Sequence, residues 1–144
     1  MNHALSQGRA AILLVDDHQA NLIGLGAVLS DPGYDLVLAR TAQEALERLR
    51  EREFAVILSD VRMPLMDSIQ LANRAREIQS AFETPIIFLT SGDDDKERLL
   101  QAYSAGAVDF LPEPYEPVVV KAKVAVFVRL FKQRIHIADQ AKQL

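Results

Sequence analysis

The 144-residue sequence contains no cysteine. This absence excludes a disulfide framework and the thiolate-ligated zinc and iron–sulfur sites. Long hydrophobic runs are also missing, because the longest (10–15, 55–58 and 85–89) are strand-sized and far from the ~20 residues of a membrane span. Residues 1–9 lack the pattern of a secretory signal. We therefore expect a cytoplasmic location without membrane insertion.

A basic excess is lacking too. Lys and Arg number 16 against 20 Asp and Glu, a formal net charge of −4, which argues against direct nucleic-acid binding as the main task. Hydrophobic residues make up 49% of the chain, enough to build a core, and the length fits one domain. The remaining question is whether the acids are dispersed or gathered.

Apolar runs alternate with helix-period segments along the chain. Strands are predicted at 11–15, 36–39, 56–58, 86–89 and 108–111, and helices at 21–29, 41–51, 69–78, 96–104 and from Pro117 onwards. Such alternation predicts an α/β fold with a parallel sheet between two helical layers. Five units of this length match the doubly wound, flavodoxin-like sheet with strand order 2-1-3-4-5.

The last helix is unusually long. After Pro117 the sequence contains no further Pro and no Gly, so the helix would run for ~27 residues, or about 40 Å. Leu130, Ile137 and Leu144 recur at intervals of seven in its second half. This spacing is typical of a coiled-coil seam, and a polar tail is the equally open alternative.

Acidic and hydroxyl residues follow the predicted strands where these end. Asp16 and Asp17 follow the first strand, Asp60 the third and Thr90 the fourth. Ligands of doubly wound sheets bind at this edge, so we expect the side chains to converge there. Carboxylates brought together repel one another unless a cation joins them, and oxygen ligands suit Mg²⁺ or Mn²⁺.

A carboxylate beside a hard cation can act as a nucleophile on phosphorus and form an aspartyl phosphate. Asp60 is the candidate nucleophile because it ends the central strand. Asp17 is the candidate direct metal ligand, and Asp16 assists directly or through water. The hydroxyl of Thr90 is placed to contact the phosphoryl group.

Four stretches of the sequence, taken together, resemble the receiver domain of two-component response regulators over about residues 10–131. They are Val15-Asp16-Asp17, Ser59-Asp60-Val61-Arg62-Met63-Pro64, Leu89-Thr90-Ser91 and Ala105-Gly106-Ala107-Val108-Asp109-Phe110-Leu111.

The resemblance implies that a histidine kinase or phosphotransfer protein phosphorylates Asp60. It implies a Mg²⁺ site made of Asp16, Asp17, Asp60 and the backbone carbonyl of Arg62. It also implies a switch in which Thr90 moves and Phe110 changes rotamer, although Phe110 is equally well read as a core aromatic. The face made by the helix at 96–104, the strand at 108–111 and the last helix would then change partners or form a homodimer, for which the last helix alone is the other candidate.

One departure from the family is serious. The family places a lysine followed by proline after the fifth strand, and this chain has Glu113-Pro114. The resemblance implies that the lysine pairs with the nucleophile and the phosphoryl group and that the X-Pro bond is cis. A glutamate there adds repulsion, which predicts weak or short-lived phosphorylation.

Three alternatives remain beside the phosphoacceptor function. The chain could be a degenerate receiver that acts as a phosphorylation-independent dimerisation or docking module, or the receiver part of a hybrid sensor kinase. A metal-dependent phosphatase would need an acid two residues after Asp60, where Arg62 stands, so no enzymatic activity beyond self-phosphorylation is expected. We divide the chain into a tail (1–9), a receiver domain (10–131) and a helical extension or linker (132–144).

Overall fold

The computed structural model describes residues 5–6, 8–60, 68–78, 84–90, 100–101, 103–104 and 109–143. The described strands are β1 (Leu5–Ser6), β2 (Arg9–Val15), β3 (Tyr34–Ala39), β4 (Val56–Asp60), β5 (Ile86–Thr90) and β6 (Asp109–Pro112). The described helices are α1 (Gln19–Leu29), α2 (Ala42–Glu51), α3 (Ser68–Glu77) and α5 (Pro117–Gln143). Residues 100–101 and 103–104 are helical as well, within the segment predicted at 96–104.

The parallel part of the sheet has the predicted topology. β3 pairs with β2, β2 with β4, β4 with β5 and β5 with β6, all parallel. In the numbering of the five predicted strands this is the order 2-1-3-4-5, which confirms the doubly wound fold.

A sixth strand extends the prediction. β1 pairs antiparallel with the start of β2, with Leu5 opposite Ala10, in the segment expected to be a tail. Gly8 lies between the two strands with φ of 79°, a conformation that glycine adopts without steric cost and that closes a tight turn. A two-residue strand has no periodicity from which it could be recognised.

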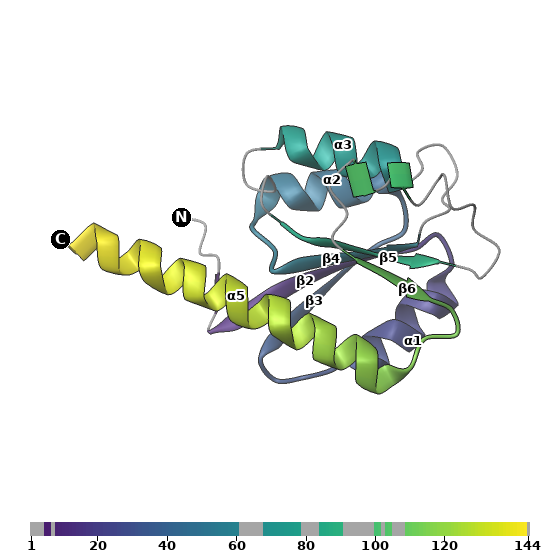
Figure 1. Cartoon of the computed structure of the whole chain (residues 1–144), viewed down its shortest axis with the longest axis horizontal. Helices are drawn as coiled ribbons and strands as arrows, with labels where there is room; N and C mark the ends of the chain where they lie inside the picture. The colour runs from purple at the N-terminus through teal and green to yellow at the C-terminus, as the bar shows by residue number, and fades with distance from the viewer. Residues whose placement is uncertain are drawn as a thin grey trace.

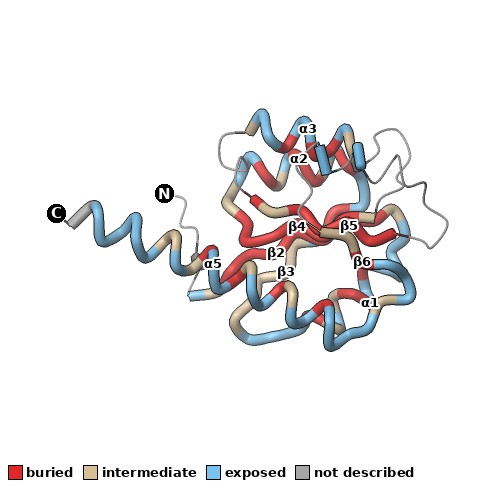
Figure 2. The backbone as a smooth tube through the Cα atoms, in the orientation of Figure 1, coloured by how far each residue is buried: buried red, intermediate tan, exposed pale blue. Residues whose placement is uncertain are grey.

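Helices cover both faces of the sheet. α2 and α3 lie on one face, and α1 and α5 lie on the other (Figure 1). The central strands are buried from both sides (Figure 2), which is why they are apolar throughout instead of alternating. Odd-numbered residues of β2, such as Leu13, pack towards α2 and α3, whereas even-numbered residues, such as Leu14, pack towards α1 and α5.

The predicted helix boundaries hold where the sequence carried capping signals. Thr41 caps α2, and its hydroxyl accepts a hydrogen bond of 3.0 Å from the backbone N–H of Glu44. Pro117 is the first residue of α5, which continues unbroken for 27 residues. Its C-terminal part projects past the edge of the sheet (Figure 1). Within the described ranges, no helix has the combination of length and apolar content that a membrane crossing needs.

Candidate functional site

An acidic cluster lies at the carboxyl ends of two neighbouring strands. Asp16 and Asp17 directly follow β2, and Asp60 is the last residue of β4. Val15 pairs with Ser59, so the two strands end side by side. Ligand atoms of Asp16, Asp17, His18 and Asp60 all lie within 4.8 Å of one another. The fold therefore brings together the three carboxylates that the sequence analysis selected.

The carboxylate of Asp16 is fixed by its neighbours at the start of α1. The side chain belongs to a residue only 4% exposed. One oxygen, Oδ1, accepts a hydrogen bond of 2.9 Å from the backbone N–H of His18, and Oδ2 accepts one of 3.1 Å from Nδ2 of Asn21. Charge-assisted bonds of this kind are short and directional, so the two contacts fix the position of the Asp16 side chain.

Asp17 presents the least satisfied oxygen of the cluster. Its Oδ1 is buried and accepts no hydrogen bond from any residue that the structure describes. Nδ1 of His18 lies 3.0 Å from it, a contact that is an ion pair only when the imidazole is protonated. A buried carboxylate oxygen without a donor is expensive, and a divalent cation would satisfy it.

The donor set fits a hard cation. Three carboxylates in one cluster, with an unsatisfied oxygen among them, match the oxygen ligands that Mg²⁺ prefers and compensate its charge. His18 is the one described residue within 4 Å that can offset Asp16 or Asp17 with a positive charge. The predicted fourth ligand, the carbonyl of Arg62, lies outside the described residues.

Thr90 stands at the same edge. It is the last residue of β5 and is buried, and its pairing with Pro112 joins it to β6. Its backbone carbonyl accepts a hydrogen bond of 2.7 Å from the N–H of Glu113. The backbone of Glu113 is thereby tied to the end of the strand that carries Thr90.

Glu113 adds negative charge to this end of the molecule. It lines a cavity of about 190 Å³ together with Asp16, Pro114 and Tyr115. The Glu113–Pro114 bond is cis, as the resemblance implied. Burial raises the pKa of the Tyr115 phenol, and the charges of Glu113 and Asp16 raise it further. The side chain of Glu113, although exposed, therefore contributes to the same negative field as the cluster.

Phe110 packs in the core on the side of α2 and α3. Its ring centroid lies 5.8 Å from that of Phe88 and 4.6 Å from that of Tyr103, the latter edge to face. The half-buried ring therefore has the packing of a core aromatic, and its role as a switch stays a prediction.

The sequence analysis assigned no role in the site to three residues that the structure places here. His18 and Asn21 hold Asp16, and Tyr115 borders the cavity with Glu113. The signal for the first two was the short distance along the chain from Asp16, since the first turn of α1 begins right after the acid pair. For Tyr115 the signal was its position directly after Glu113-Pro114.

Comparison with known proteins identifies the family of the chain. The family model of the response regulator receiver domain matches residues 12–125. The chain is 36% identical to the transcriptional regulatory protein FixJ of Bradyrhizobium diazoefficiens over 118 residues, covering 82% of this chain and 56% of FixJ. The chain spans about half the length of the first curated relatives it matches.

Two solved structures are similar throughout the fold. The chemotaxis protein CheY4 of Vibrio cholerae is 28% identical with a TM-score of 0.76, covering 83% of this chain and 98% of CheY4. The receiver domain of the sensor histidine kinase PA1611 of Pseudomonas aeruginosa, solved with a magnesium ion coordinated in its active-site cleft, is 25% identical with a TM-score of 0.74 and covers 83% and 98%. Receiver domains are signalling modules that generally interact with histidine kinases or phosphotransfer proteins. The chain belongs to the response regulator receiver domain family.

Proposed function

We propose that this chain is a phosphoacceptor that takes a phosphoryl group on Asp60 from a histidine kinase or phosphotransfer protein. The observation that carries the proposal is the convergence of Asp16, Asp17 and Asp60 within 4.8 Å at the carboxyl ends of β2 and β4. Family membership supports it, because the region that matches the receiver family, residues 12–125, includes all three acids.

The chemistry assigned to each group follows from its position. A carboxylate oxygen of Asp60 attacks phosphorus, the O–P bond forms, and the bond from phosphorus to the donor's imidazole nitrogen breaks. Asp16 and Asp17, with Asp60 and the Arg62 carbonyl, would hold Mg²⁺, which supplies positive charge for the phosphoryl oxygens. The hydroxyl of Thr90 would donate to one of those oxygens. Asp60 is partly exposed, so a donor can reach it.

We further propose that Thr90 and Phe110 pass the modification on to the rest of the domain. The two residues lie on neighbouring strands, and Phe110 packs on the aromatic pair Phe88 and Tyr103. A change at Thr90 would be transmitted to the face made by the helical segment that includes 103–104, by β6 and by α5. We keep the boundaries 10–131 and 132–144, because Phe131 is the last buried residue of α5 among those described.

The proposal is tested with acetyl phosphate and Mg²⁺, and Phos-tag electrophoresis and intact mass report the modification. Wild type should gain one phosphoryl mass with Mg²⁺ and none with EDTA. Asp60→Asn should gain none, whereas Asp35→Asn, at the other end of the sheet, should behave as wild type. Labelling of Asp60→Asn would overturn the assignment of the nucleophile.

The second candidate is a docking module that works without phosphorylation. The observation that favours it is Glu113, whose negative charge acts at the end of the sheet where the family carries a lysine. This candidate predicts no labelling under any phosphodonor, with binding of partners unchanged by Asp60→Asn. A hybrid sensor kinase that contains this receiver is compatible with the first candidate, since the receiver domain of the sensor histidine kinase PA1611 has the same fold at 25% identity.

A further inference from the structure

A flank of α5 carries an apolar stripe that the sheet does not cover. The inner side packs on the sheet through Val120, Val124, Val128 and Phe131. On the flank of the helix, Val119, Val126, Leu130 and Ile137 are between 41% and 65% exposed. We call these four residues the outer seam. Large apolar side chains gathered in this way on one surface mark an interaction site.

The spacing of the outer seam is that of a coiled-coil helix. Its members follow one another at intervals of seven, four and seven residues, which places them at the a and d positions of consecutive heptads. The heptad core position that falls between Val119 and Val126 is occupied by Lys123, whose ammonium group forms an ion pair with Asp109. A helical partner is therefore the shape that this surface fits.

The residues beside the seam select the charge of that partner. Arg129 precedes Leu130 at a g position, and Arg134 follows it at an e position. In a two-stranded coil with a second copy of this chain, these positions would place arginine opposite arginine in parallel pairing and in antiparallel pairing alike. Like charges at e and g disfavour pairing, whereas a helix with acidic residues at those positions would be attracted.

α5 and the rest of the chain carry net charges of opposite sign. α5 carries six Lys and Arg against one Asp, a net charge of +5. Since the whole chain has a net charge of −4, the rest of the chain has a net charge of −9. An anionic membrane would attract the helix but repel the rest of the chain, and a narrow acidic helix lying along α5 avoids that conflict.

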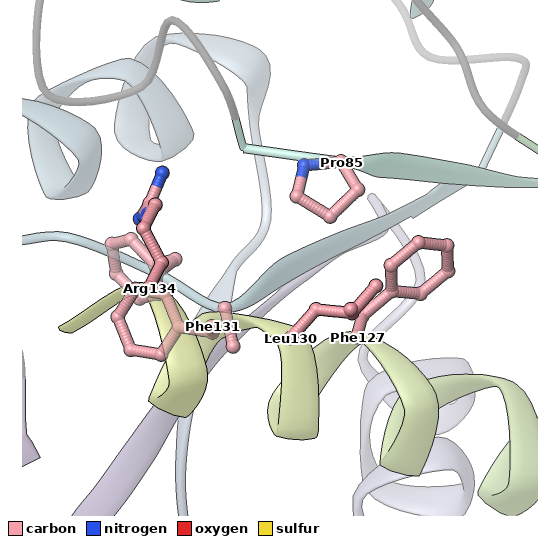
Figure 3. Close-up of a pocket in the computed structure, with 7 residues that line it drawn as sticks. Pro85, Phe127, Leu130, Phe131 and Arg134 are labelled. Carbon is pink, nitrogen blue, oxygen red and sulfur yellow. The ribbon is translucent and has the colours of Figure 1, made fainter. Parts of the chain in front are cut away.

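A pocket next to the seam offers a place for an anchor. It has a volume of about 230 Å³ and is lined from the sheet by Phe54, Ala55 and Pro85 and from α5 by Phe127, Leu130, Phe131 and Arg134. The α5 side chains stand on one side of it and Pro85 on the other (Figure 3). Cavities of about 150 Å³ take up a benzene molecule, so one aromatic or leucine side chain fits here.

We infer that the outer seam, with this pocket, binds an amphipathic helix of another protein whose flanks are acidic and which inserts one large apolar side chain beside Leu130. Arg129 and Arg134 pair with its acids. The pocket lies at the amino ends of β4 and β5, at the opposite end of the sheet from Asp60. Binding there does not require phosphorylation.

The test uses two labelled three-heptad peptides with leucine at a and d, one with glutamate and one with lysine at every e and g position. Each peptide is kept from pairing with itself by its own like charges. In fluorescence anisotropy titrations at about 50 mM salt, the full chain should bind the glutamate peptide at least about tenfold tighter than the lysine peptide. Raising the salt to about 0.3 M should weaken the binding.

Matched variants locate the site. Ile137→Ser, at a residue 65% exposed, should weaken binding at least about fivefold, whereas Ile23→Ser, at a residue of α1 that is 61% exposed, should not. Arg129→Glu with Arg134→Glu should invert the preference between the peptides. Lys121→Glu, on the same helix but away from the seam, and Asp60→Asn should leave it unchanged. Circular dichroism confirms that each variant is folded.

Three outcomes would overturn the inference. The first is equal affinity for the two peptides. The second is self-association of the chain in analytical ultracentrifugation that Ile137→Ser abolishes, because the occupant would then be a second copy. The third is flotation of the chain with phosphatidylglycerol vesicles without peptide binding, which would make the occupant a membrane. Loss of phosphoryl labelling alone would affect the proposed function and leave this inference standing.

Discussion

The two ends of the sheet are built for opposite charges. At the carboxyl ends of β2 and β4, three carboxylates share one small space and Glu113 lies beside them. At the amino ends of β4 and β5, an apolar pocket is bordered by Arg134, and α5 continues beyond it with a basic surface. The same parallel strands connect the two regions. Because helices cover both faces of the parallel sheet, its two ends can carry different chemistry.

The largest effect is expected where α5 joins the sheet. Phe131→Ala removes a side chain that is 4% exposed and packs in the core with Val128, and such truncations cost about 3–5 kcal/mol of unfolding free energy. Leu130→Ala, at a neighbour 53% exposed, should cost less than about 1 kcal/mol. Urea unfolding followed by circular dichroism measures both. Equal losses would mean that α5 is not attached to the sheet through Phe131.

The next effect concerns Glu113. Glu113→Lys replaces a negative charge near the cluster with a positive one, and a charge contact at an exposed residue is worth up to about 1 kcal/mol after screening. We expect about a tenfold longer half-life or higher labelled fraction of Asp60, followed by Phos-tag electrophoresis with acetyl phosphate. Glu116→Lys, two residues beyond Pro114, is the matched charge control. Identical labelling of Glu113→Lys and wild type would refute the role of Glu113.

A smaller effect should appear in stability without metal. Asp60→Asn relieves repulsion among the carboxylates, and since Asp60 is partly exposed we expect a gain of only about 1 kcal/mol after solvent screening. Added Mg²⁺ should stabilise wild type and reduce this gain. Thermal melts with and without Mg²⁺ provide the measurement. If Asp60→Asn were less stable than wild type in EDTA, favourable contacts of the Asp60 carboxylate would outweigh its repulsion from the other carboxylates.

The smallest effect is a shift in the titration of Tyr115. Its pKa lies above the ordinary 10.0 because of burial and because of Glu113 and Asp16, so Glu113→Gln should lower it. A raised folded-state pKa means that its contribution to stability is complete below pH 10 and is lost as the pH rises through that pKa. Tyrosinate absorbance near 295 nm, with Tyr115→Phe to assign the signal, follows the shift. An unchanged titration in Glu113→Gln would place the side chain of Glu113 away from the phenol.

Much of this organisation was predictable because it rests on local signals. Thr41, three residues before Glu44, determined where α2 begins, and Pro117 determined where α5 begins. The apolar run at 11–15 identified a strand buried on both faces, and the acids after it located the cluster once the strand order was known.

Other features depend on contacts that no local pattern records. β1 pairs with the first residues of β2, where Leu5 lies opposite Ala10 and the pairing of β2 with β4 has not yet begun. This is a pairing between short segments of little distinct composition. The hydrogen bond from Asn21 to Asp16 requires the first turn of α1 to fold back over the strand end. The second apolar side of α5 was visible as a seven-residue recurrence, but its exposure could be known only after the inner side had been assigned to the sheet.

The length of α5 gives the molecule a mechanical property. Beyond Phe131 the helix continues to Gln143, which at 1.5 Å per residue is a rod of about 18 Å. Because its base is clamped against the sheet, a tilt of about 10° at the clamp would displace the far end by about 3 Å, several times the movement at the base. A small rotation of α5 is thus amplified by leverage, and anything fixed to the far end would experience a displacement large enough to change which surfaces meet.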